Sequence, residues 1–120
     1  MIGADFGKLL FKVDGKIVSL KIWDFNGQQR FIQMNRNFYR DAHCVFLFYD
    51  ITKEKTFVNL TNWIKDLKEN FNRKVIIYLI GNKCEMQESR AITYEKALNF
   101  ASEHKIQRVF ETSAKTGFNV

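Results

Sequence analysis

The chain has 120 residues, a length that allows at most one domain. Its composition, 46% hydrophobic and 15% aromatic without proline, is typical of a folded core and excludes a disordered tail. The net charge of +6 comes from 19 basic and 13 acidic residues that are scattered along the chain, so the basic stripe typical of nucleic-acid binding is missing and no nucleic-acid partner is expected.

The cysteines and the lengths of the apolar runs indicate the compartment. Cys44 opens an apolar run and is expected to be a small core residue, whereas Cys84 lies in a polar loop without a second cysteine at metal or redox spacing. No disulfide is expected, and a reducing compartment is favoured. No signal peptide and no run of about 20 apolar residues is found, so the sequence predicts a cytoplasmic protein without a transmembrane segment.

An antiparallel hairpin is predicted at the start of the chain. Apolar residues alternate with mostly polar ones around a tight Asp14-Gly15 turn: Leu9, Phe11 and Val13 before it, and Val18, Leu20 and Ile22 after it. This pattern predicts two strands with one buried face. Phe6 and Trp23 fall on the opposite face. Two large aromatic residues there indicate either a contact surface for a partner or positions that a neighbouring loop covers, and the pattern favours neither.

Two buried strands follow a polar stretch. Residues 24–41 are glutamine-rich and weakly periodic, with a short helix expected at most near the end. Residues 44–49 and 75–80 are continuous apolar runs, rich in β-branched and aromatic side chains. Runs of this kind predict parallel strands that are buried on both faces.

Two helices and a last strand complete the pattern. Apolar residues at helical spacing predict a helix after the first of these strands, with Thr52 as its N-cap: Phe57, Leu60, Ile64, Leu67 and Phe71. A second helix is expected after Thr93, with an apolar face made of Tyr94, Ala97, Leu98 and Ala101. A short strand is expected at 108–111. Strands that alternate with helices predict a three-layer α/β fold with right-handed crossovers.

Three polar loops follow predicted strand ends, at 24–28, 81–85 and 112–115. In α/β sheets ligands bind beyond the carboxyl ends of the strands, so these loops are expected to converge on one ligand site. Each loop alone is a weak signal, because an isolated Asn-Lys pair is usually a turn. Their order and their places at strand ends make the combination strong.

Six sequence blocks, in order, resemble the Rab family of small GTPases within the Ras superfamily: IGADF at 2–6, KIWDFNGQQRF at 21–31, FYRDA at 38–42, FYDIT at 48–52, GNKCE at 81–85 and ETSAK at 111–115. The resemblance covers essentially all of the chain. It implies a single, partial G domain over 1–120 with a P-loop NTPase-like α/β fold. It also implies GTP or GDP with Mg²⁺ as ligands, and Rab effectors and regulators of vesicle-mediated transport as partners.

The resemblance assigns base recognition to two loops. Asn82 would hydrogen-bond the guanine ring, along whose face Lys83 would pack its stem, and Ser113, Ala114 and Lys115 form the second loop. There Ala114 would offer its N–H to the base oxygen, and Lys115 would brace the loop. Glu85 stands where the family has the aspartate that binds both N–H groups of the guanine edge. The longer side chain keeps the charge but displaces the two acceptors.

The switch segments carry the other implied roles. Asp24 matches the residue that holds Mg²⁺ through water, Gly27 the glycine that senses the third phosphate, and Gln28 the glutamine that orients the attacking water. Three positions depart from the family, because Phe25 and Asn26 replace Thr-Ala and Met1 replaces the switch threonine. The aromatic triad that binds effectors in the family matches Phe6, Trp23 and Phe38.

The phosphate-binding pattern GxxxxGK[ST] does not occur in these 120 residues, since Gly7-Lys8 is followed by Leu9 inside a predicted strand. The resemblance places that loop, the first strand and the first helix before Met1, and the last helix after Val120. We therefore expect an incomplete fold, truncated at both ends, with unpaired strand edges in the middle of the sheet. Such a chain is expected to be marginally stable in isolation.

Three interpretations of the chain remain open. The chain is a segment of a vesicle-traffic GTPase whose GTP binding and hydrolysis are lost or impaired in the chain itself. Alternatively, it is a non-catalytic, effector-binding module derived from a Rab, or a remnant without function. Whether it is an enzyme stays open, and no lipid anchor is encoded in these residues.

Overall fold

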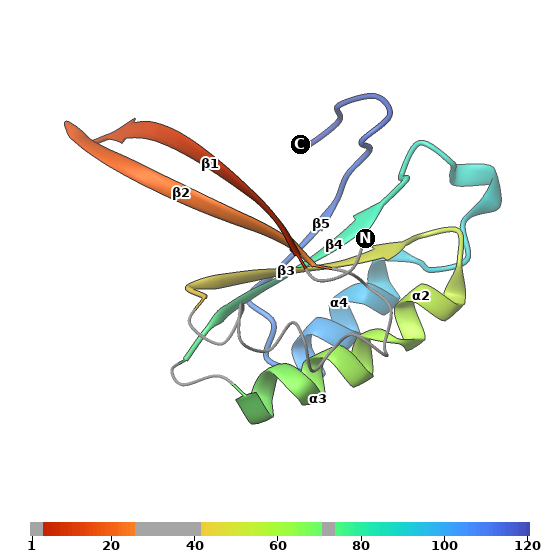
Figure 1. Cartoon of the computed structure of the whole chain (residues 1–120). Helices are drawn as coiled ribbons and strands as arrows, with labels where there is room; N and C mark the ends of the chain where they lie inside the picture. Colours follow the sequence, from red (N-terminus) through yellow and green to blue (C-terminus); the bar gives the residue numbers. More distant parts are fainter. Residues whose placement is uncertain (1–3, 26–41, 71–73) are drawn as a thin grey trace. The chain divides into compact units, whose positions relative to one another are not determined.

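The computed structural model describes residues 4–25, 42–70 and 74–120 (Figure 1). These residues belong to two compact units that meet in sequence between Asp41 and Ala42, and each unit is described by itself. The predicted single domain over 1–120 stays a prediction.

The described part of the first unit is the predicted hairpin. Strand β1 (Ala4–Val13) pairs with β2 (Lys16–Phe25) in antiparallel register, so that Leu9 lies opposite Leu20. The turn between them has positive φ at Asp14 (50°) and Gly15 (78°), as a two-residue hairpin turn requires. The hairpin predicted from the sequence is therefore confirmed.

The burial predicted for one hairpin face is not found. Apolar side chains are exposed on both faces: Leu9, Phe11, Val18, Leu20 and Ile22 on one, and Leu10 and Ile17 on the other. A two-stranded ribbon has no second layer of its own against which a face could be buried. The described strands form two separate sheets, one with β1 and β2 and the other with the remaining strands.

The second unit is a parallel sheet of β3 (Cys44–Asp50), β4 (Ile76–Asn82) and β5 (Arg108–Glu111), in the order β3-β4-β5. Its helices are α2 (Glu54–Val58), α3 (Leu60–Asn70), α4 (Tyr94–Glu103) and the short 3-10 helix η2 (Gln87–Ser89). Figure 1 shows α2, α3 and α4 on one face of this sheet. The predicted α/β order of parallel strands and crossover helices is confirmed.

The core of this unit lies between the sheet and its helices. Buried residues from both layers fill it, among them Leu47, Leu79, Leu60, Ile64 and Leu67. Phe46 and Phe48 point to the other face and are 57% and 58% exposed. The prediction of strands buried on both faces is therefore wrong for β3, because alternate side chains face away from the helical layer. Cys44 is exposed too, contrary to its expected place in the core.

The first predicted helix is divided in two. Asn59 separates α2 from α3, and the N-cap of α2 is Lys53 without a side-chain capping bond. Thr52 is not a cap, because its hydroxyl donates to Asp50 Oδ1 at 2.6 Å. The apolar stripe is confirmed at Phe57, Leu60, Ile64 and Leu67, whereas Phe71 lies outside the described residues.

Helix α4 begins where the sequence predicts. Thr93 is its N-cap and accepts a hydrogen bond from the Lys96 amide at 3.1 Å. Ala97 and Ala101 are buried, but Tyr94 and Leu98 are exposed, so the predicted apolar face is right only for the two alanines. The helix packs through these two small residues, one turn apart, and through Phe100, whose ring lies 4.9 Å from that of Phe57 between centres. Among the described helices, none is long and apolar enough to cross a membrane.

Tyr49 of β3 covers Gly81 of β4, its partner in the register. A Cβ atom at Gly81 would lie 2.6 Å from the Tyr49 hydroxyl. This hydroxyl is buried and has no hydrogen-bond partner among the described residues. Burial, and then the charge of Glu111, raise the pKa of Tyr49 to about 12. Tyr49 is therefore a buried donor that folding leaves unsatisfied.

We expect Tyr49→Phe to raise the free energy of unfolding by about 1 kcal/mol, because it removes an unsatisfied buried hydroxyl and keeps the ring. Urea unfolding followed by circular dichroism measures the change. Tyr94→Phe is the matched control, since the hydroxyl of Tyr94 is exposed and donates to the Val109 carbonyl at 3.5 Å. A loss of stability in Tyr49→Phe would show that the hydroxyl has a favourable partner.

Candidate functional site

Two of the three polar loops come together at the carboxyl ends of β4 and β5. The Cys84 amide donates to the Thr112 carbonyl at 3.0 Å and joins the loops directly. Lys83, just before it, has φ 67°, a left-handed conformation that turns the chain sharply at the strand end. The predicted convergence of these two loops is confirmed.

Asn82 connects the loops through its side chain. Its Oδ1 accepts from the Ala114 amide at 3.1 Å and from the Thr112 hydroxyl at 3.2 Å. With the oxygen used in this way, the amide nitrogen of Asn82 remains a donor, and no partner for it occurs within the described ranges. The Ala114 N–H that the resemblance assigns to the base oxygen is thus already bonded within the protein, and it would have to be shared with a ligand.

Glu85 reaches the second loop as well. The buried Ser113 hydroxyl donates to Glu85 Oε1 at 2.6 Å and accepts from the Thr116 amide at 3.1 Å. Despite its extra methylene, Glu85 is therefore held by this serine through one oxygen. Its Oε2 remains an acceptor, because the described part of the chain offers it no hydrogen bond.

An acidic residue missed by the sequence analysis fixes the end of Lys83. Its Nζ lies 2.8 Å from Asp50 Oδ2, and Asp50 Oδ1 accepts from both the amide and the hydroxyl of Thr52. Burial by itself would raise the pKa of Asp50, but the bonds from Lys83 and Thr52 outweigh it and lower this pKa to about 2. The same contact raises the pKa of Lys83. The position of Asp50 at the end of a predicted strand was the sequence signal that could have indicated its place at the site.

A shallow, open hollow of about 240 Å³ lies beside this ion pair, lined by Phe48, Tyr49, Asp50, Thr56, Asn82 and Lys83. Lys83 keeps 46% of its side chain exposed. Its stem can therefore offer an apolar surface to a ring while its ammonium group stays with Asp50.

The Asp50–Lys83 pair predicts a specific loss of stability in acid. Because the pKa of Asp50 falls from 3.8 to about 2 on folding, its contribution is present above pH 3.8 and disappears as the pH falls towards 2. We expect Asp50→Asn to flatten this part of the stability profile and to lower the free energy of unfolding by about 1 kcal/mol at pH 7. The loss is no larger because solvent screens the partly exposed Lys83.

Urea unfolding at a series of pH values measures this effect. The matched control is Glu88→Gln, which removes an exposed carboxylate from η2 and should leave the profile unchanged. An Asp50→Asn profile that still falls as steeply as the parent between pH 4 and pH 2 would contradict the assignment.

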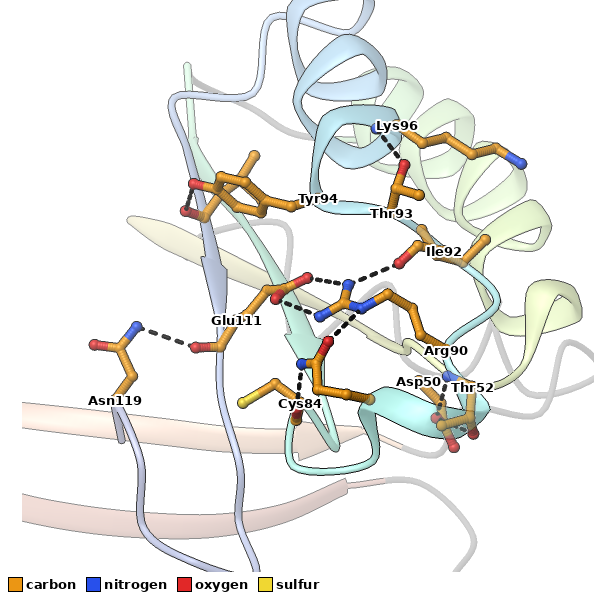
Figure 2. A network of polar contacts seen from close by, with 12 residues as sticks. Asp50, Thr52, Cys84, Arg90, Ile92, Thr93, Tyr94, Lys96, Glu111 and Asn119 are labelled. Atoms are coloured by element: carbon orange, nitrogen blue, oxygen red, sulfur yellow. Dashed lines mark hydrogen bonds and ion pairs between the residues drawn. The ribbon is translucent and has the colours of Figure 1, made fainter.

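Arg90 is the second charged residue that the sequence analysis missed. Its guanidinium forms a bidentate pair with Glu111, at 2.7 and 2.8 Å, directly before the loop at 112–115 (Figure 2). The hydrogen bond and charge of Glu111 raise the pKa of Arg90. The side chains of the two residues are each 18% exposed, so solvent screens this pair less than an exposed one.

The remaining predicted site residues are only partly described. Asp24 is exposed near the end of β2, and Phe6 is paired with Trp23 in the hairpin register. Met1, Asn26, Gly27, Gln28 and Phe38 lie outside the described residues. The approach of the Asp24 loop to the other two therefore stays a prediction.

The described residues fit a purine base better than a metal ion. Four groups lie around one strand edge: a hydrogen-bond donor from Asn82, the apolar stem of Lys83, an acceptor oxygen from Glu85 and the shared N–H of Ala114. Within the described ranges, no three metal-ligating side chains gather at one place. The implied Mg²⁺ therefore has one described candidate ligand, Asp24, and no step is derived through it.

Comparison with known proteins agrees with this arrangement. The Ras family model matches residues 1–120. The chain is 46% identical over 119 residues to Ras-related protein Rab-13 of Canis lupus familiaris, and 45% identical over the same length to those of Rattus norvegicus and Bos taurus. Each match covers 99% of this chain and 58% of the relative.

The chain thus spans less than two thirds of the length of these relatives. Its α/β order and its paired strand-end loops fit an incomplete small G-protein fold. With a family match over the full chain and close Rab relatives, the protein belongs to the Ras family and is Rab-like.

Proposed function

We propose that the chain forms the base-reading end of a guanine-nucleotide site of the Rab type. We further propose that these 120 residues recognise the base without binding the phosphates tightly, and that GTP binding and hydrolysis are impaired in them. The family supports a role in vesicle-mediated transport at the cytoplasmic side of membranes, with GTP or GDP and Mg²⁺ as the ligands of the complete site.

The observation that carries this proposal is the joining of the two loops by five hydrogen bonds. Two of them link Thr112 to the first strand end, from its amide to the Gly81 carbonyl at 2.9 Å and from its hydroxyl to Asn82 Oδ1 at 3.2 Å. The other three run from the Cys84 amide to Thr112, from the Ala114 amide to Asn82, and from the Ser113 hydroxyl to Glu85, at 3.0, 3.1 and 2.6 Å. These hydrogen bonds within the protein hold the polar groups of both loops around one strand edge. Such preorganisation lowers the cost of binding.

The phosphate side lacks comparable support. The sequence holds no GxxxxGK[ST] loop, whose backbone N–H groups and lysine would neutralise the phosphates. The base alone offers few contacts, so we expect dissociation constants in the millimolar range, about −4 kcal/mol.

Equilibrium dialysis of the purified chain with guanosine, adenosine and GDP, each with Mg²⁺, tests both parts. Guanosine should bind several-fold more tightly than adenosine, and GDP should bind within about tenfold of guanosine. Equal binding of guanosine and adenosine would overturn base recognition. Micromolar or tighter, guanine-selective binding of GDP would overturn the impairment.

One observation favours a second function, the binding of effector proteins by the hairpin. Phe6 and Trp23 are direct partners in the β1–β2 register, so these two aromatic positions lie on the same face. Trp23 is exposed. Exposed aromatic residues are typical anchors of protein interfaces, and the aromatic position Phe38 would complete the set assigned by the resemblance.

Effector binding can be tested by isothermal titration of the chain with a panel of Rab effector domains. Trp23→Ala should weaken any binding about 30-fold or more, since loss of a hot-spot aromatic costs at least about 2 kcal/mol. Ile17→Ala is the matched control, because Ile17 is an exposed apolar residue near the hairpin turn. Equal losses in both variants, or no binding to any effector, would contradict a role of the aromatic pair.

A further inference from the structure

The guanidinium of Arg90 is a polar hub beside the base-reading loops. Its Nε donates to Gln87 Oε1 at 3.1 Å, and one terminal nitrogen donates to the Ile92 carbonyl at 2.8 Å. The two terminal nitrogens also donate to the Glu111 carboxylate at 2.7 and 2.8 Å (Figure 2). Both ends of the planar group are therefore engaged, and its orientation is fixed.

One arm of this hub ends on the first loop. The Gln87 amide accepts from Arg90 at one end and, at the other, donates through Nε2 to the Cys84 carbonyl at 2.6 Å. Cys84 stands between Lys83 and Glu85, two of the three residues of this loop that are assigned to the base. The orientation of Arg90 is thus linked to the backbone between them.

The other arm ends on the second loop. Glu111 is the last residue of β5 and directly precedes Thr112, Ser113 and Ala114. Its carbonyl accepts from Asn119 Nδ2 at 3.1 Å, which closes the far end of this loop (Figure 2). The Gly117 amide donates to the Ser113 carbonyl at 2.8 Å and makes the turn compact.

The geometry points to Arg90 as a positioning residue that sets the spacing of the two base-reading loops, one through Gln87 and Cys84 and the other through Glu111. Arg90 is assigned no contact with the base and acts through these residues. This inference rests on the proposed base recognition. It goes beyond that proposal because it names the group outside the site on which base selectivity depends.

The planar fork explains why arginine stands at this position. A guanidinium presents its Nε and two terminal nitrogens in fixed directions, so a single side chain can bind Gln87 and form a bidentate pair with Glu111. A lysine supplies the charge but not the second direction. Replacement of Arg90 by lysine should therefore keep an attraction to Glu111 and lose the arm to Gln87.

Three variants separate positioning from stability. Gln87→Ala removes only the arm to Cys84, from an exposed position, and should leave the thermal unfolding midpoint almost unchanged. Arg90→Lys should retain most of the stability and lose the same arm. Arg108→Gln is the matched control, because Arg108 is an exposed arginine of the same sheet, in β5.

Two readouts are measured on each variant: the ratio of guanosine to adenosine affinity, and the amide chemical shifts of Cys84 and Ala114 without nucleoside. We expect Gln87→Ala and Arg90→Lys to lower the ratio about three- to tenfold and to displace the Cys84 amide, since small misplacements of binding groups have effects of this order or larger. Arg108→Gln should change neither. Rescue of the ratio by Arg90→Lys, or an unchanged ratio in Gln87→Ala, would overturn the inference.

The shift readout separates this inference from the proposed function. If the parent chain shows no preference for guanosine, base recognition fails. The positioning inference then depends on the amides alone. Displacement of the Cys84 amide in Gln87→Ala, with no change in Arg108→Gln, still supports it, and an undisturbed Cys84 amide overturns it.

Discussion

Replacing Gly81 with alanine is expected to lower the free energy of unfolding by about 1–3 kcal/mol, the usual cost of overpacking a core. The added Cβ would lie 2.6 Å from the Tyr49 hydroxyl, 2.7 Å from the ring carbon that carries it and 3.1 Å from Cγ2 of Ile51. Tyr49 cannot move aside easily, because it is buried and makes an edge contact with Phe57 at 5.1 Å between ring centres. Asn82, which follows Gly81, would be displaced with it.

The chain is expected to be marginally stable, so a loss of this size should leave Gly81→Ala largely unfolded. The dispersion of its amide NMR spectrum measures this outcome. Gly7→Ala is the control, since no atom lies within 4 Å of a Cβ at that position. A well-dispersed Gly81→Ala spectrum and an unchanged thermal midpoint would show that the sheet accommodates the methyl group.

Shortening Glu85 to aspartate is expected to raise the preference for guanosine over inosine by about tenfold or more. Inosine lacks the 2-amino group and differs from guanosine only there. In the present structure one oxygen of Glu85 accepts from Ser113, which leaves the other for a ligand. One free acceptor can bind the ring N–H that the two nucleosides share. We therefore expect the parent chain to bind them almost equally.

Glu85→Asp should let the carboxylate face the edge of the base with both oxygens. A second charge-assisted hydrogen bond adds about 1.5 kcal/mol or more, which corresponds to about tenfold in affinity. Competition of inosine with guanosine in equilibrium dialysis measures the ratio. Glu88→Asp is the control, since Glu88 is exposed in η2. A parent chain that already prefers guanosine tenfold would contradict the assignment of a single acceptor.

Local chemistry explains what could be predicted from the sequence. The hairpin turn followed from Asp14-Gly15, both of which have positive φ, and the α4 cap followed from Thr93. The meeting of the loops after β4 and β5 followed from parallel strands, whose carboxyl ends share one edge. In each case neighbouring residues or the chain direction determine the outcome.

Features that depend on distant packing could not be read in this way. Continuous apolar residues in β3 indicated burial on both faces, but Phe46 and Phe48 face away from the single helical layer of the described part. The pairs Asp50–Lys83 and Arg90–Glu111 join residues 33 and 21 positions apart, respectively. Thr52 has a residue type suited to a cap, yet its amide and hydroxyl both bond Asp50 Oδ1 two residues earlier, in a local turn at the strand end that the helical pattern did not indicate.

The most direct test of base recognition maps guanosine onto the ¹⁵N-labelled chain by amide chemical shifts. We expect millimolar guanosine to shift the amides of Lys83, Cys84, Ala114 and Lys115, while adenosine at the same concentration leaves them nearly unchanged. The hairpin amide of Leu10 should respond to neither nucleoside. Equal shifts with both nucleosides, or guanosine shifts confined to residues outside the two loops, would contradict a base-reading site at the ends of β4 and β5.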